Sequence, residues 1–162
     1  MKQNSTIKEQ SLNPQPTART QAQPQAVRNT DECDEKLDER VCTALHAAGE
    51  KKAIEPVVLD LREIASFTDY FVIVSGANER QVQAISDEVY EQLKKAGSPA
   101  ARVEGYKTAE WILLDYGDFV VHVFEQKARK FYDLERLWRE SKRVELPADL
   151  TGESPSSLRK ES

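Results

Sequence analysis

Residues 110–138, EWILLDYGDFVVHVFEQKARKFYDLERLW, constrain the fold of this 162-residue chain more than any other stretch. Two apolar runs flank a short acidic turn, and a segment typical of a helix follows them. Both tryptophans of the chain lie in this stretch, yet it holds no paired nucleophile and base and no metal-ligand spacing. So much apolar surface without reactive groups indicates a contact surface rather than a reaction site.

The turn between the two apolar runs predicts a β-hairpin. Tyr116 and Gly117 read as a two-residue turn, with Gly117 supplying the positive φ. This turn would pair Leu114 with Phe119 and Trp111 with His122, and strand alternation then sorts the side chains by face. The first face is wholly apolar and is predicted to be core: Ile112, Leu114, Phe119, Val121 and Val123. The second face mixes apolar groups with an indole and an imidazole: Trp111, Leu113, Val120, His122 and Phe124.

The second face of the hairpin allows two interpretations. A helix covers it, as is normal in α/β sheets, or it remains an exposed aromatic and aliphatic patch of the kind that binds a partner. The rest of the sequence predicts only three helices, and the last one is short. Complete cover of both faces is therefore not expected, and the partner interpretation stands.

Composition divides the chain into three parts. Residues 1–35 are rich in Gln, Pro, Thr and Asn and have almost no large apolar side chains. Such a segment cannot offset its ordering entropy by burial, so we predict a disordered tail there and a second one over residues 147–162. Residues 36–146 form the predicted domain. The first segment lacks the apolar core of a secretory signal, and its few Arg and Ser favour a bacterial cytoplasm over a plastid.

Hydrophobic periodicity places the elements of the domain. A helix is predicted from about Leu37 to Gly49, and a second one follows Asn78 as its N-cap and ends at Gly97. Strands are predicted at 56–61, 67–76 and 101–106, before the hairpin, and a last helix at about 129–140. This order indicates an α/β fold, a single compact domain with a mixed β-sheet and flanking helices.

Several groups of the sequence are candidate reactive centres. Ser75-Gly76 before a helix is similar to the opening of a nucleotidyltransferase site, but that site needs closely spaced acidic residues on the following strand to hold magnesium, and none follow. The two cysteines and two histidines lack metal-ligand or dyad spacing. We predict no metal, no cofactor and no enzyme activity, with a nucleotidyltransferase-type enzyme as the alternative. The carboxylates that motivate the alternative stand at strand ends: Asp60, Asp69, Asp115 and Asp118.

The net charge of −5 argues against a general nucleic-acid binder, which needs a basic face to displace counterions. The last helix is nevertheless basic, although acidic residues partly balance it. Two interpretations stay open: a solvated face, or a surface that steers the protein toward an anionic assembly. The basic residues are Arg129, Lys130, Arg136, Arg139, Lys142 and Arg143.

Taken in order, three segments resemble the ribosomal silencing factor family, RsfS, also called Iojap. They are FTDYFVIVSGANERQVQAISDEV, AEWILLDYGDFVVHVF and ARKFYDLERLW. The resemblance covers residues 37–138 and implies a nucleotidyltransferase-like fold without the catalytic acids. It also implies binding to the uL-fourteen protein of the large ribosomal subunit and a steric block of small-subunit joining, which represses translation under nutrient limitation.

The same resemblance implies further properties. Organellar relatives act in large-subunit assembly, so an assembly factor that uses the same interface is the alternative function. Members need no cofactor and can form homodimers. We expect no sequence-specific nucleic acid and no membrane as partners, because the chain is acidic and no apolar segment approaches the roughly 20 residues that span a bilayer. Carried over by position, the partner-binding residues are Trp111, Leu113, Asp115, His122, Phe124 and Tyr132.

Overall fold

The structure is a computed structural model in which Cys33 and residues 37–151 are described. A six-stranded sheet crosses the domain in the order β4-β5-β6-β3-β2-β7. β3 and β6 are parallel, and the other neighbours are antiparallel, which confirms the predicted mixed sheet. The strands are β2 (Ile54–Asp60), β3 (Tyr70–Gly76), β4 (Arg102–Glu104), β5 (Trp111–Asp115), β6 (Phe119–Glu125) and β7 (Lys142–Arg143).

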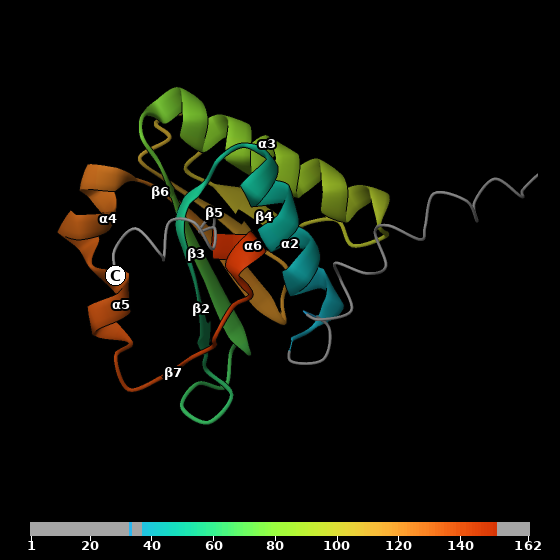
Figure 1. Ribbon diagram of the computed structural model, residues 1–162, viewed down its shortest axis with the longest axis vertical. Helices are drawn as coiled ribbons and strands as arrows, with labels where there is room; N and C mark the ends of the chain where they lie inside the picture. The colour runs from blue at the N-terminus through green and yellow to red at the C-terminus, as the bar shows by residue number, and fades with distance from the viewer. Residues whose placement is uncertain (1–32, 34–36, 152–162) are drawn as a thin grey trace, which may run out of the picture. The chain divides into compact units, whose positions relative to one another are not determined.

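Two helices pack together on one face of the sheet (Figure 1). α2 (Glu39–Glu50) begins after Asp38, whose side chain accepts a hydrogen bond from the backbone N–H of Arg40. α3 (Glu79–Lys95) begins after Asn78, whose side chain accepts from the N–H of Gln81 at 2.9 Å, so the predicted cap is confirmed. The stripe of α3 that faces the sheet is fully buried: Val82, Ile85, Val89 and Leu93.

The hairpin pairs in a different register from the predicted one. Trp111 lies opposite Phe124, and Asp115 lies opposite Val120, so the register differs by two residues. The N–H of Tyr116 donates to the carbonyl of Phe119, so the chain turns at Gly117 and Asp118, one residue later than predicted. A shift of two residues keeps every side chain on its face, whereas a shift of one would have exchanged the faces. The predicted sorting of side chains is therefore correct although the predicted pairs are wrong.

The last predicted helix is two short helices, α4 (Gln126–Tyr132) and α5 (Leu134–Leu137). α4 begins early because the Glu125 carboxylate accepts hydrogen bonds from the N–H groups of Lys127 and Ala128. The break falls at Asp133, whose φ of 50° and ψ of 51° are left-handed, a conformation that no α-helix continues through. The chain therefore bends at Asp133, and the two helices together are called the α4–α5 arm below.

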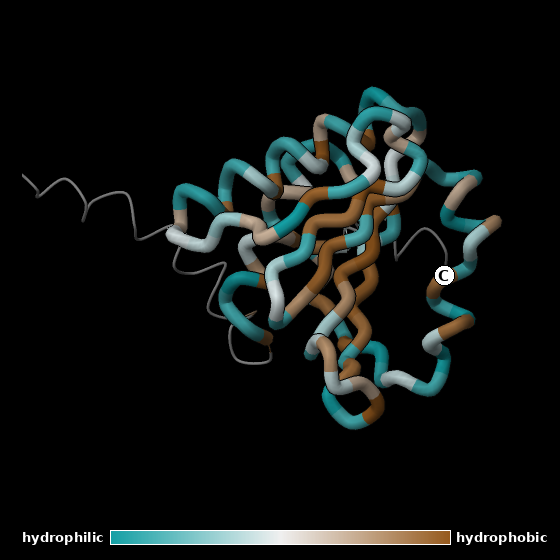
Figure 2. Tube along the Cα trace, turned by 180° about the vertical axis from the view of Figure 1, so that it is seen from behind, coloured by the Kyte–Doolittle hydropathy of each residue, from teal (hydrophilic) through white to brown (hydrophobic). Residues whose placement is uncertain are grey.

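The α4–α5 arm lies on the sheet face opposite α2 and α3 (Figure 1). It supplies Ala128 and Leu134 to a second apolar cluster, whose sheet members are Leu59, Leu61, Phe71, Ile73, Val120 and Phe124. In Figure 2 the strands form the hydrophobic centre of the domain, and the trace of the arm stands beside them. Trp111 and Leu113 of β5 pack at the margin of this cluster and stay half-buried. The second face is thus covered in part, which answers the question that the sequence left open.

The end of the domain also differs from the prediction. The tail predicted over residues 147–162 is wrong for its first residues, because a short helix, α6 (Ala148–Thr151), packs against α2 and β2 and buries Leu150. The sequence did not predict this helix, because a single apolar side chain, Leu150, is too weak a pattern to indicate one. Residues 152–162 and most of the predicted tail 1–35 lie outside the described residues. Among the described helices, none has the length and apolar character needed to cross a membrane.

Arg129 of α4 connects the arm to the sheet. Its guanidinium makes a two-point ion pair with Glu135 of α5, with Nε and Nη2 donating to the two carboxylate oxygens at 3.1 and 3.0 Å. Its Nη1 donates to the carbonyl of Glu55 and to the hydroxyl of Ser75, both at 2.8 Å. Glu55 has a φ of 49° at the irregular end of β2, so this carbonyl is one that sheet pairing leaves open. One side chain, 9% exposed, therefore ties together α4, α5, β2 and β3.

Replacing Arg129 by Met should destabilise the fold strongly, because it leaves the Glu55 carbonyl, the Ser75 hydroxyl and the Glu135 carboxylate without this donor. Loss of one partner of a buried ion pair costs about 3–5 kcal/mol in free energy of unfolding. Arg62→Met removes an exposed arginine from its pair with Asp60 and should cost less than about 1 kcal/mol. Urea unfolding followed by circular dichroism compares the two variants, and equal losses would show that the Arg129 contacts are dispensable.

Candidate partner-binding site

The half-covered margin of the sheet presents an aromatic surface. Trp111 and Leu113 point from β5 to the same face, and the Tyr132 ring of α4 lies 4.9 Å from the Trp111 ring. Tyr132 is 47% exposed, and the other two are half-buried. We call these three residues the Trp111 surface. It brings together three of the six predicted partner-binding residues from two elements that are far apart in sequence.

The Trp111 ring rests on a fixed base. Its Nε1–H donates to Nδ1 of His122 at 3.1 Å, and its ring stacks on Phe124 at 4.9 Å with 29° between the planes. The hydrogen bond requires Nδ1 to be the acceptor, so the proton of the neutral imidazole sits on Nε2. Among the described residues Nε2 has no hydrogen-bond partner, and the imidazole meets the Phe71 ring edge-on at 4.5 Å. His122 and Phe124 therefore hold the indole of Trp111 in one orientation.

His122 and Phe124 themselves are buried, with 3% and 0% of their surfaces exposed. The expectation that these two side chains lie on the surface is wrong in this structure, because α4 and the Trp111 ring cover them. Alternation places a side chain on a face but does not say what lies over it. His122 and Phe124 lie beneath the Trp111 surface and hold the indole in place.

Asp115 lies at the end of β5 on the same face as Trp111. Its carboxylate pairs with Arg102 of β4 at 3.2 Å and also accepts the N–H of Gly117 at 2.9 Å. The side chain keeps 26% of its surface accessible. It can therefore meet a partner at the rim while it stabilises the hairpin turn.

Gly105 fixes the backbone at the start of β5, a role that no local pattern in the sequence indicates. Its φ is 82°, and a Cβ at this position would overlap the carbonyl oxygen of Trp111. Only glycine combines the left-handed conformation with this close approach. The loop from Gly105 to Ala109, closed by the Ala109 N–H to Gly105 carbonyl bond, thus sets where Trp111 begins the strand.

Most of the strand-end carboxylates on which the alternative of an enzyme rested form ion pairs with arginines. Asp60 pairs with Arg62 at 2.8 Å, and hydrogen bonds from this side chain hold the pKa of Asp60 below its usual range. Asp118 pairs with Arg40 at 2.7 Å, a contact that links the hairpin turn to α2. No group of three or more His, Cys, Asp or Glu side chains converges on a point within the described residues. These carboxylates hold loops and helix ends together.

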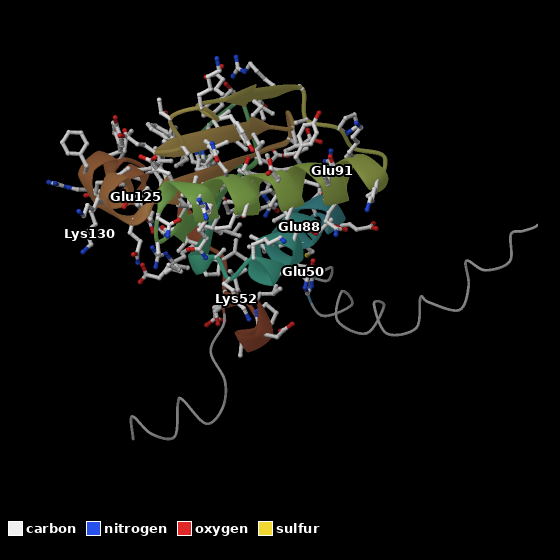
Figure 3. The ribbon with its side chains drawn as sticks, turned by 90° about the horizontal axis from the view of Figure 1, so that it is seen from above. Glu50, Lys52, Glu88, Glu91, Glu125 and Lys130 are labelled. Atoms are coloured by element: carbon white, nitrogen blue, oxygen red, sulfur yellow. The ribbon has the colours of Figure 1, made fainter. Side chains whose placement is uncertain are left out.

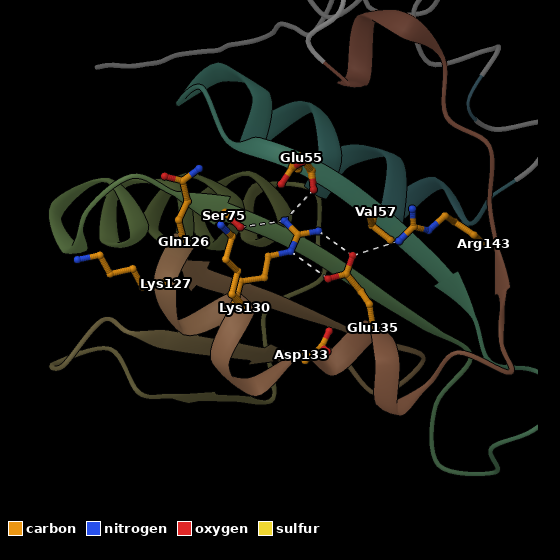
Figure 4. A pocket seen from close by; sticks show the side chains of 10 residues that line it. Glu55, Val57, Ser75, Gln126, Lys127, Lys130, Asp133, Glu135 and Arg143 are labelled. Atoms are coloured by element: carbon orange, nitrogen blue, oxygen red, sulfur yellow. Dashed lines mark hydrogen bonds and ion pairs between the residues drawn. The ribbon is translucent and has the colours of Figure 1, made fainter.

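A polar hollow of about 460 Å³ lies beside the arm (Figure 4). Its floor is the ion-pair network of Arg129 and Glu135, which Arg143 joins at 3.2 Å from the Glu135 carboxylate. Lys127 and Lys130 of α4 line its rim. The acidic residues around it are Glu55, Asp133 and Glu135.

Comparisons with known proteins give this geometry a context. The family described as "Ribosomal silencing factor during starvation" has a sequence model that matches residues 34–162. The chain belongs to this family. The ribosomal silencing factor RsfS of Halalkalibacterium halodurans is 43% identical over 103 residues, which cover 64% of this chain and 88% of that protein. The predicted resemblance is confirmed.

Two further members of the comparison bear on fold and role. A crystal structure of a protein from Bacillus halodurans superposes with a TM-score of 0.61 at 42% identity, covering 67% of this chain and 98% of that chain. A mouse protein named "Mitochondrial assembly of ribosomal large subunit protein 1" is 36% identical over 75 residues, 44% of this chain and 33% of that protein. The α/β fold of this family member is thus shared with an experimental structure.

Gly105→Ala should destabilise this family member far more than Gly117→Ala. Both glycines have a φ near 82°, so both substitutions carry the cost of a left-handed alanine, about 1–2 kcal/mol. Gly117 has open space where a Cβ would sit, but Gly105 faces the Trp111 carbonyl. We expect a total loss of about 3 kcal/mol or more for Gly105→Ala, measured by urea unfolding. Similar losses for both would remove the close approach as the reason for this glycine.

The buried His122 should make stability fall in acid. Burial lowers the pKa of His122 to about 3, while the unfolded chain has the ordinary value near 6.5. Between these values the unfolded state binds a proton that the folded state does not, so the free energy of unfolding declines as the pH falls from about 6.5 to about 3. His122→Gln, which cannot titrate, should lack this part of the decline, amounting to about 2–3 kcal/mol at pH 4.5. Parallel pH profiles of wild type and variant would contradict a buried neutral imidazole.

Proposed function

We propose that this protein binds the large ribosomal subunit through its uL-fourteen protein and blocks joining of the small subunit by steric exclusion. The observation that carries the proposal is the Trp111 surface, an aromatic and aliphatic patch on a rigid support in a member of the ribosomal silencing factor family. Large aromatic side chains in half-buried positions are the usual anchors of protein interfaces. The protein acts here as a binding factor and not as an enzyme.

The support of Trp111 favours a binding role on energetic grounds. Its hydrogen bond to His122 and its contacts with Phe124 and Tyr132 hold the indole before any partner arrives. Ordering a side chain on association costs about 0.5–1.5 kcal/mol, and a held ring avoids most of this cost. Leu113 beside it adds apolar area, and Asp115 at the rim adds a charge that a basic partner can meet.

In this proposal, translation is repressed under nutrient limitation because the bound protein occupies the joining face of the large subunit. A protein bound at the face of the large subunit that meets the small subunit excludes the latter by volume, and no chemical step is needed. We place this activity in the cytoplasm, since the ribosomal silencing factor of Halalkalibacterium halodurans is a bacterial relative of this chain. Self-association through the same apolar patch would compete with subunit binding.

A second candidate function rests on the mouse relative, which is named for assembly of the mitochondrial large subunit. An assembly factor would use the same surface on an immature subunit. Depletion of the protein separates the two roles. Accumulation of large-subunit precursors supports assembly, whereas normal subunits with excess joined ribosomes in starved cells support silencing.

Trp111→Ala should abolish co-sedimentation with isolated large subunits, because truncating an aromatic anchor costs about 2 kcal/mol or more of binding energy. That cost corresponds to roughly a thirty-fold weaker Kd. Tyr132→Ala removes an exposed ring of the same surface with less effect on the fold. Tyr106→Ala is the matched control, since Tyr106 is an exposed tyrosine that contacts Asp87 of α3 instead. Full binding by folded Trp111→Ala and Tyr132→Ala would place the interface elsewhere.

A further inference from the structure

Positive charge is concentrated in the α4–α5 arm and the strand that follows it. Residues 126–143 hold seven Lys or Arg against three Asp or Glu, a net charge of +4 in a chain whose total is −5. In Figure 3 Glu50 on α2 and Glu88 and Glu91 on α3 lie away from the arm, and Lys130 extends outward from α4. The acidic average of the chain therefore hides a local basic surface.

Two lysines of this surface are free to meet a ligand. Lys127 and Lys130 are exposed, stand three residues apart on α4 and so project on one side of the helix. Neither makes an ion pair with any of the described residues, in contrast to Arg129, Lys142 and Arg143. The ammonium groups of Lys127 and Lys130 are therefore available to a ligand.

The space beside these lysines suits a phosphate group. Lys127 and Lys130 line the polar hollow of about 460 Å³, and Figure 4 shows both side chains with Arg143 around it. Glu135 is already shared by Arg129 and Arg143, which leaves Glu55 and Asp133 as the acidic groups that face the lysines without an ion pair among the described residues. The hollow carries four cationic and three anionic side chains, so its own balance is positive.

The adjoining aromatic ring favours RNA as the occupant. Phe131 follows Lys130 directly and is 80% exposed, and its neighbour Tyr132 belongs to the Trp111 surface. Exposed aromatic rings between basic side chains are typical of RNA contacts, where a ring stacks on an unpaired base and cations meet phosphates. The large subunit, the partner in the proposed function, presents RNA around its proteins.

We propose that Lys127 and Lys130 bind the phosphate backbone of RNA that borders the protein partner of the Trp111 surface. The contact is independent of base sequence, because ammonium groups read phosphates as point charges. It adds a salt-dependent attraction to an interface whose anchor is apolar. This inference rests on the proposed function, since the RNA lies beside that same binding site.

The test compares Lys127→Gln/Lys130→Gln with Lys94→Gln/Lys95→Gln, an equal change of charge in two exposed lysines at the end of α3. Kd for isolated large subunits is measured for the full chain over a range of salt concentrations. Each lost phosphate contact should lower the slope of log Kd against log salt by about 0.7–0.9. We expect that decrease for the α4 pair and an unchanged slope for the α3 pair.

Two further readouts separate this inference from the proposed function. The α4 pair should bind the isolated uL-fourteen protein as wild type does, whereas Trp111→Ala should lose that binding too. A photoreactive phenylalanine analogue at position 131 should cross-link to RNA in the large subunit. Cross-links to protein alone, or an unchanged salt slope in the α4 pair, would overturn the RNA contact while leaving the proposed function intact. Absence of wild-type binding to the subunit would overturn both.

Discussion

The arm that builds the candidate site depends on one buried guanidinium. Arg129 donates to Glu135 in the same arm and to Glu55 and Ser75 in the sheet, so it fixes the bend at Asp133 and the position of the arm together. A short helix of one or two turns is not stable by itself, and tertiary contacts must hold it. With these contacts the arm covers the second face of the sheet and carries Tyr132 to the margin where β5 is still open.

The candidate partner-binding site exists because the α4–α5 arm covers only part of the second face of the sheet. The arm lies over the central strands and leaves Trp111 and Leu113 half-buried at the β5 side. His122 and Phe124 are buried beneath Trp111 and Leu113. His122 accepts the hydrogen bond of the indole and Phe124 stacks on its ring, so together they orient the Trp111 side chain. A rigid apolar patch rimmed by charge fits recognition of a folded partner better than it fits a reaction, which agrees with membership in a family of ribosomal silencing factors.

Prediction from the sequence succeeded where the signal is local and failed where it depends on distant contacts. The cap at Asn78 and the two faces of the hairpin follow from residue type and period, and the faces survived a register error because the error was an even number. The exposure of His122 and Phe124 was wrong, since the cover comes from another element. The need for glycine at position 105 was not predicted, because it arises from the close approach of the Trp111 carbonyl, six residues later in the chain.

The sequence by itself determined the α/β class, the approximate ends of the first two helices of the domain and which side chains share a face. These depend on backbone preferences and on periods of 2 and 3.6 residues, which are written in neighbouring positions. Only the tertiary structure decided that the last helix breaks at Asp133, that Arg129 is buried and satisfied, and that Trp111 stays partly open. The reason is physical: burial and pairing are properties of what packs against a residue, and those partners come from segments that the local pattern does not identify.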